Sequence, residues 1–190
     1  ILPYQNQGLA GRLTYNYKYK YFIEGNFGWN GSENFASGKR FGFFPAVALG
    51  WYISEEPFWE GIKKVLPKFK VRGSIGTVGN DKLGSTRFAY ITEVVNGASY
   101  NFGSVSTYNP VTGLTEGKFG APNLTWETET KRDVGLEINL LGSIDINIDY
   151  YYTNRKNIFT QRRIIHGTAG FTQAPWTNLG KKANHGLNIR

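Results

Sequence analysis

The stretch that decides the fold runs from Val134 to Tyr152 and reads VGLEINLLGSIDINIDYYY. Apolar and polar residues alternate on both sides of a short break at residues 141–143. Side chains on a β-strand point to opposite faces with a period of two. The pattern therefore predicts a hairpin of two long strands with one apolar and one polar face. The polar face is expected to carry Glu137, Asn139, Asp145, Asn147 and Asp149.

Strand length separates two kinds of β protein that share this alternation. A soluble β-sandwich usually shows it in shorter strands. A transmembrane barrel needs about 9–11 residues for each crossing, with apolar side chains facing out and polar ones facing in. Both predicted strands reach that length, which favours the barrel. The polar residues of the hairpin are then expected to face the lumen.

Composition excludes several classes of protein. The 190 residues include 24 glycines and 16% aromatic residues, a profile that suits strands and turns, and no cysteine is available for a disulfide or a thiolate metal site. The sequence contains no run of about 18 apolar residues of the kind that a transmembrane helix needs. The net charge of +8 comes from scattered lysines and arginines without a nucleic-acid-binding motif, so we expect no nucleic-acid partner.

The same reading divides the chain into seven strands of one partial β-barrel domain over residues 1–190. The expected strands span residues 11–18, 20–30, 40–54, 67–79, 125–141, 143–158 and 181–190. Two of them add lumen-facing polar candidates, namely Glu24, Asn26, Lys70 and Arg72. Residues 57–66 have apolar side chains at helical spacing after two acids and a proline, which predicts a short amphipathic helix.

Connections must alternate between the two ends of such a sheet, and their lengths differ. The tight turns near residues 19 and 142 fall on one end, together with the predicted helix. The long segments 81–123 and 160–178 fall on the other end. Outer-membrane barrels have short periplasmic turns and long extracellular loops. We therefore expect a periplasmic helix and extracellular long segments.

Several short stretches resemble the C-terminal half of SusC/RagA-type TonB-dependent outer-membrane transporters. They occur in the family's order from about Gly11 onward. They are residues 40–51 with 53–56, 71–76 with Gly79-Asn80, Pro122 to Glu127, Asp149 to Tyr152, and 178–180 with 184–186. The resemblance implies an all-β fold in which these antiparallel strands form part of a 22-stranded transmembrane barrel in the bacterial outer membrane.

The resemblance also implies what the whole protein does. It implies nutrient import driven by TonB, with a SusD-like surface lipoprotein that captures glycans or peptides outside the cell. The plug domain and the segment that contacts TonB are expected to lie outside this stretch of chain. Lipid of the outer membrane would surround the barrel, and no cofactor is implied.

No residue set in the sequence forms a convincing catalytic constellation. His166 and His185 lack a second ligand at metal spacing. Asp145 and Asp149 could mimic the acid pair of a glycosidase, but they are read more simply as lumen-facing polar residues. Trp126 is expected to anchor its strand at the membrane interface. The chain is therefore expected not to be an enzyme.

Long loops on a rigid scaffold carry binding more often than the scaffold does. The candidates for contact with a ligand or a lid protein are the loop aromatics Tyr90, Tyr100, Tyr108 and Trp176. Packing of the loops on themselves is the alternative role for these side chains. A soluble β-sandwich or barrel that binds carbohydrate is the alternative function, and it would bury the apolar face that a transporter leaves in lipid.

Overall fold

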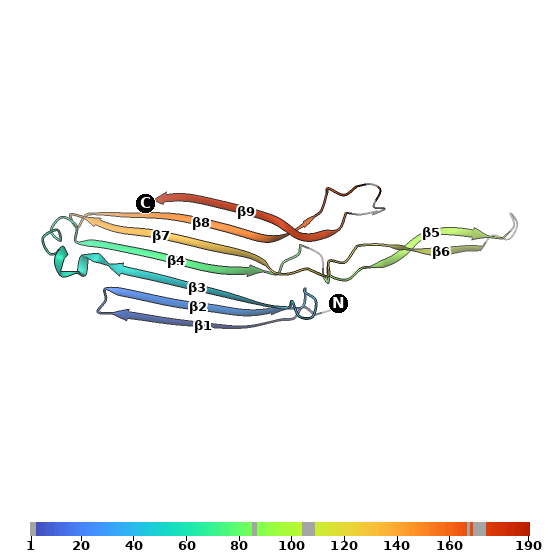
Figure 1. The fold of residues 1–190 in the computed structure, drawn as a ribbon, viewed down its shortest axis with the longest axis horizontal. Helices are drawn as coiled ribbons and strands as arrows, with labels where there is room; N and C mark the ends of the chain where they lie inside the picture. The colour runs from blue at the N-terminus through green and yellow to red at the C-terminus, as the bar shows by residue number, and fades with distance from the viewer. Residues whose placement is uncertain (1–2, 85–86, 104–108, 167, 169–173) are drawn as a thin grey trace.

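The computed structural model describes residues 3–84, 87–103, 109–166, 168 and 174–190. Seven strands form one antiparallel sheet in the order β1-β2-β3-β4-β7-β8-β9, and a separate hairpin, β5-β6, extends beyond its end (Figure 1). In the sheet the bounds are Asn6–Tyr17 (β1), Tyr21–Ser32 (β2), Phe41–Tyr52 (β3), Lys68–Asn80 (β4), Glu127–Leu140 (β7), Ile144–Gln161 (β8) and Trp176–Ile189 (β9). Within the described residues β1 and β9 are not paired, so the sheet is open, as expected for part of a larger barrel.

The seven strands of the sheet occupy the regions that alternation predicted, with longer ends. β1 begins at Asn6 rather than at residue 11, and β9 begins at Trp176 rather than at residue 181. The segment 81–123, expected to be a loop, contains the hairpin of β5 (Val94–Phe102) and β6 (Asn109–Glu116). Its alternation is broken by a bulge between Asn96 and Ser99, which hides the strand signal.

The two tight turns share one geometry. Lys20 N donates to Tyr17 O and Ser143 N donates to Leu140 O, both at 3.0 Å. In each turn the two central residues have positive φ: 52° and 56° at Lys18 and Tyr19, and 52° and 71° at Leu141 and Gly142. Positive φ at both central positions is the type I′ arrangement, whose twist matches that of paired strands.

The predicted helix over residues 57–66 is wrong. The structure has two 3₁₀ turns, Ile53–Glu55 (η1) and Pro57–Trp59 (η2), followed by turns up to Val65. Hydrogen bonds alternate there between i→i−3, as in Val65 N to Ile62 O, and i→i−4, as in Lys63 N to Trp59 O. So short a segment, interrupted by Gly61, does not supply enough helical hydrogen bonds to offset the cost of nucleation.

The placement of this segment agrees with the alternation of ends. It lies at the same end of the sheet as the β1-β2 and β7-β8 turns, while β5-β6 and the β8-β9 connection lie at the other end (Figure 1). Leu141 N donates to Val65 O at 2.9 Å, which ties the β7-β8 turn to the segment. We call these the turn end and the loop end. Among the described residues, no helix is long and apolar enough to cross a membrane.

The buried hydrophobic residues gather at the loop end. The hydrophobic cluster comes from the loops around residues 33–40, 81–93 and 117–126 together with one strand. Its members are Phe35, Phe44, Leu83, Ala89, Ala121, Leu124 and Trp126. Along the strands, by contrast, large apolar side chains stay exposed, as with Leu13 at 77% and Leu49 at 56%.

Candidate functional site

The hairpin β7-β8 sorts its side chains as the alternation predicted. Val134 pairs with Tyr150, and Leu136 with Ile148, on one face. Glu137 pairs with Asn147, and Asn139 with Asp145, on the opposite face. Extending the register across β4 and β9 gives the sheet an apolar face and a polar face. All nine predicted polar candidates lie on the polar face.

Ion pairs cross-link the polar face of β4, β7 and β8. Glu137 accepts from Lys68 at 3.1 Å and from Lys70 at 3.3 Å. Arg72 reaches the carboxylates of Asp149, Glu137 and Asp133, which lie on two neighbouring strands. Such cross-strand pairs of opposite charge stabilise a sheet and fix its register. Lys70, Arg72, Glu137 and Asp149, predicted separately, therefore form one network.

Gly135 makes room for this network. A Cβ atom at residue 135 would lie 2.4 Å from Asp149 Oδ1 and 2.7 Å from Arg72 Nε. The glycine sits opposite Asp149 and Arg72 in the two neighbouring strands. The Arg72–Asp149 pair thus crosses above a strand position that no side chain occupies.

Two further clusters complete the polar face. Glu24 pairs with Arg12 at 2.7 Å and accepts from Asn26 Nδ2 at 2.7 Å. Near the loop end, Arg155 pairs with Glu127 and Glu129 across β7-β8. The predicted site candidates did not include Arg12, Lys68, Asp133, Glu127, Glu129 and Arg155. The signal was present, because each follows the same period of two as its named neighbours.

The two aspartates that could mimic a glycosidase pair have other partners. Asp145 accepts from Asn139 Nδ2 at 2.8 Å, and Asp149 is paired with Arg72. Neither carboxyl group is left to act as an acid and a base across a substrate. In the described part of the chain no group of three or more His, Cys, Asp or Glu residues is arranged to hold a metal ion.

The loop aromatics predicted to contact a ligand lie in different places. Tyr100 is 69% exposed on β5, with its ring centroid 4.9 Å from that of Phe102. Tyr90 is half-buried beside Phe88 at the base of the hairpin. Trp176 stacks on Phe159 at 5.1 Å, and Tyr108 lies outside the described residues. Among the described candidates, only Tyr100 presents most of its ring to solvent.

Trp126 was expected at the membrane interface, and that expectation is wrong. It is 8% exposed and packs between Phe35 and Phe44, with ring centroids 5.2 Å away in each case. Its indole Nε1 donates to Arg40 O at 3.1 Å. A buried indole is satisfied when its N–H has such a partner. Trp126 therefore joins the loops into a small core on the polar side of the sheet.

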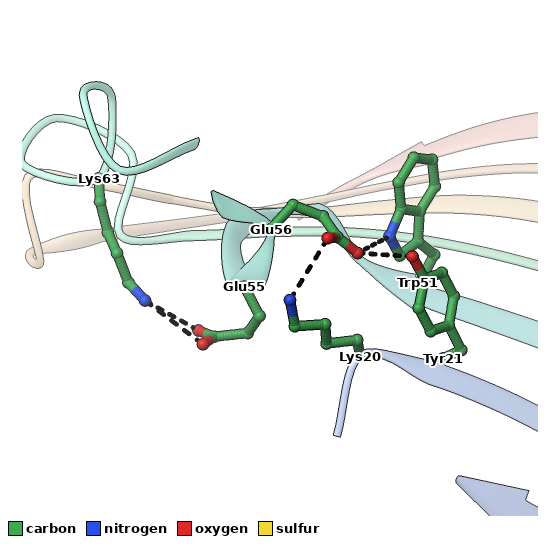
Figure 2. A network of polar contacts seen from close by, with 6 residues as sticks. All are labelled: Lys20, Tyr21, Trp51, Glu55, Glu56 and Lys63. Atoms are coloured by element: carbon green, nitrogen blue, oxygen red, sulfur yellow. Dashed lines mark hydrogen bonds and ion pairs between the residues drawn. The ribbon is translucent and has the colours of Figure 1, made fainter. Parts of the chain in front are cut away.

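The turn end is held by a polar hub instead of a core (Figure 2). Tyr21 OH and Trp51 Nε1 donate to Glu56 Oε1 at 2.7 and 3.2 Å, and Lys20 Nζ donates to Glu56 Oε2 at 3.3 Å. These hydrogen bonds, with that from Tyr21 first, hold the pKa of the Glu56 carboxyl below its usual range. The preceding residue, Glu55, points away from this hub and pairs with Lys63 (Figure 2).

The family model and similar curated proteins point to the same family. The family described as TonB dependent receptor-like, beta-barrel matches residues 6–190. The TonB-dependent receptor SusC of Bacteroides thetaiotaomicron is 34% identical over 185 residues, which are 94% of this chain and 17% of that protein. The TonB-dependent receptor P26 of Formosa agariphila is 31% identical over 186 residues, or 96% of this chain and 18% of that protein.

Solved structures agree on the fold. The RagAB peptide importer in its open-open state superposes with a TM-score of 0.79 at 20% identity, covering 98% of this chain and 19% of that one. The siderophore receptor PirA of Pseudomonas aeruginosa gives 0.59 at 15% identity, covering 97% and 30%. The chain thus spans less than a fifth of the length of the curated relatives that it matches.

Proposed function

The chain belongs to the TonB dependent receptor-like β-barrel family, and from that premise we propose that it forms part of the wall of a nutrient importer. Proteins of this family reside in the bacterial outer membrane, and the named relatives are receptors rather than enzymes. The chain is accordingly part of an outer-membrane protein. The proposal concerns what that protein moves across the membrane and with which partners.

The observation that carries the proposal is the difference between the two faces of the sheet. The apolar face keeps Leu13, Leu49 and Val134 more than half exposed, and no element of the described chain packs over it. The polar face holds Glu137, Asp149 and Glu129 in ion pairs between strands. A barrel wall needs this arrangement, with lipid against one face and a polar lumen against the other. A soluble sandwich would bury the apolar face.

We assign the substrate class by the likeness to SusC. A protein of this type imports oligosaccharides or peptides with TonB as the energy source and a SusD-like lipoprotein as the lid. The 34% identity to SusC supports that class. In this arrangement the polar face, from Glu24 to Asp149, lines the lumen, and the plug domain comes from a part of the protein other than these residues.

The hairpin β5-β6 is the proposed point of contact with the lid or the substrate. It projects from the loop end (Figure 1). Four of its large apolar or aromatic side chains are at least half exposed, namely Tyr100 (69%), Phe102 (57%), Val111 (50%) and Leu114 (75%). An exposed apolar surface of this kind marks an interaction site. The hairpin is separate from the loop-end core, because no described residue of β5 or β6 belongs to that cluster. A backbone hydrogen bond of 3.0 Å from Glu93 N to Lys118 O closes the base of the hairpin.

Removal of this hairpin tests the proposal. Replacing residues 96–114 by Asn-Gly in the full-length importer joins Val95 to Thr115, which are already paired, and leaves Ala89 and Ala121 in the core. We expect lid binding or uptake to fall by about tenfold or more, as for loss of an interface hot spot. The amount of folded barrel in the outer membrane should stay the same.

A milder variant serves as the matched comparison. Tyr100→Ser with Phe102→Ser keeps the hairpin and removes its exposed rings, so uptake should fall with assembly unchanged. Loss of folded barrel from the membrane after the hairpin replacement would show that the hairpin is structural. Unchanged lid binding and uptake in both variants would withdraw the assignment.

A further inference from the structure

The apolar face changes its chemistry at one row of residues on β7, β8 and β9. The row Val134, Tyr150 and Leu187 is apolar or aromatic throughout. The next row toward the loop end is Arg132, Tyr152 and His185, and Lys156 follows four residues beyond Tyr152 on the same face. We call Arg132, Lys156 and His185 the basic patch. All three residues are exposed.

The other half of the sheet has no such change at the same distance from its turn. Leu9 lies nine residues before Lys18, as Arg132 lies nine residues before Leu141. Leu9 pairs with Trp29, and Trp29 pairs with Phe43, so this row is apolar. Nine residues is about one membrane crossing. The basic patch therefore lies where the apolar band ends toward the loop end, and it belongs to β7-β9.

The acids of the same strands do not balance the basic patch. Glu127, Glu129, Asp133, Glu137, Asp145 and Asp149 all lie on the opposite, polar face. There each of them has a basic or amide partner. Within the described residues, no ion pair involves Arg132, Lys156 or His185. Arg132 and Lys156 thus face outward, and no acidic side chain of the described residues pairs with either charge.

A groove adjoins the basic patch. It has a volume of about 360 Å³, and Arg132, Val134, Tyr150 and Tyr152 line it. Asp133 also borders the groove, but its carboxylate lies toward Arg72, at 3.9 Å, on the polar face. The groove thus combines a guanidinium at one end with an aromatic and apolar floor. That combination suits a molecule with an anionic head and a hydrocarbon tail.

We propose that the basic patch binds the phosphate of lipid A, the phosphorylated glycolipid of the outer leaflet. Arginine presents several N–H groups that match phosphate oxygens, and lysine adds a point charge. Tyrosine rings favour the level of the lipid headgroups. An acyl chain would lie over Tyr150 and Val134 in the groove. This binding goes beyond nutrient import: it rests on the proposed placement of the loop end outside the cell, and it does not depend on which nutrient is carried.

The test is lipid binding by the full-length importer in detergent, followed by native mass spectrometry. Lipid A and a zwitterionic phosphatidylcholine are titrated separately. In the double variant Arg132→Gln with Lys156→Gln, we expect the apparent Kd for lipid A to rise about 25-fold, because each basic residue near an anionic lipid surface contributes about fivefold. Binding of phosphatidylcholine should stay within twofold.

A charge-matched control distinguishes binding at the basic patch from a general effect of the protein's net charge. Lys131→Gln with Lys182→Gln removes two cations from the polar face of the same strands, and lipid A binding should stay within twofold. Arg132→Lys, which keeps the charge, should retain most of the binding. Equal losses in both double variants, or equal binding of the two lipids by the unmodified protein, would overturn the proposal. Heat-modifiable mobility on gels checks that each barrel is folded.

Discussion

The two ends of the sheet are stabilised in opposite ways, and two tryptophans show the difference. At the loop end Trp126 is 8% exposed inside a cluster with Phe35 and Leu124. At the turn end Trp51 is 38% exposed and stacks on Tyr21 at 6.1 Å, with its N–H directed to a carboxylate. The loop end has a protein core of its own. The turn end relies on polar hydrogen bonds among side chains that stay partly exposed.

The difference explains how the loop end carries long insertions. Phe35, Leu83, Ala89, Ala121 and Leu124 come from three separate loops and bury their side chains against one another, so this core forms without help from lipid. The hairpin β5-β6 can then project from a fixed base. The turn end needs only short connections, and two of them are type I′ turns.

The largest effect is expected from removing the loop-end core. Trp126→Ala in the full-length protein should lower the free energy of unfolding by about 3–5 kcal/mol, because it leaves a cavity among Phe35 and Phe44. It also leaves Arg40 O without its side-chain donor. Urea titration of the reconstituted barrel, followed by tryptophan fluorescence, measures the loss. Trp51→Ala at the turn end should cost clearly less, and equal costs would remove the contrast between the ends.

Sequence alone predicted the sheet because its signal is local. Alternation with a period of two is visible within each strand, and the register follows from the tight turns. The loop-end core could not be predicted in the same way. Phe35, Leu83 and Leu124 have no common period and come from segments far apart in the chain, so only the folded sheet brings them together. Trp126 was misplaced for that reason.

In the candidate site, too, features that depend on the local period were predictable, and contacts between residues distant in sequence were not. The polar candidates on the strands share one face of the sheet, because each obeys the local period, and that this face lines the lumen stays a prediction. The ion-pair partners of these residues could not be predicted, since Arg72 reaches acids that follow it by more than 60 residues. The helix at 57–66 failed because helical spacing over a short stretch does not outweigh the geometry of a connection between two fixed strands.

A smaller effect is expected between the two ends, on the apolar face. Ile148 pairs with Leu136 and with Ile189, five residues from the turn at Ser143. Ile148→Arg should cost about 2–4 kcal/mol, the range for a charge near the bilayer midplane, and Ile146→Arg should cost less because it lies closer to the interface. Asn147→Arg on the polar face is the control.

Reversible folding into vesicles of phosphatidylcholine, read by denaturant titration, compares these three variants. The order of cost should be Ile148→Arg first, Ile146→Arg next and Asn147→Arg last. If Asn147→Arg were as costly as Ile148→Arg, the two faces would not differ in their surroundings, and the assignment of the apolar face to lipid would fail.

The smallest effect is expected at the turn end and depends on pH. Glu56 is held ionised by hydrogen bonds from Tyr21, then Trp51 and Lys20, so its pKa in the folded protein lies below the ordinary 4.5. The folded state therefore binds this proton more weakly than the unfolded state does. The resulting stability is present at neutral pH and is lost as the pH falls through the lowered pKa of Glu56.

Glu56→Gln should accordingly lower the thermal midpoint of the barrel at pH 7.5, and the gap to the unmodified protein should close as the pH falls below 4.5 and past the lowered pKa. Glu55→Gln removes an acid of the same type whose side chain is 47% exposed and pairs with Lys63 at 3.2 Å. The thermal midpoint of the Glu55→Gln variant should hardly change, because exposed ion pairs contribute little.

The contradicting outcome is a difference in thermal midpoint between Glu56→Gln and the unmodified protein that stays constant down to the lowest pH. That result would mean that the Glu56 side chain acts through packing. The turn end would then depend on shape, as the loop end does, and the contrast drawn from the two tryptophans would have to be given up.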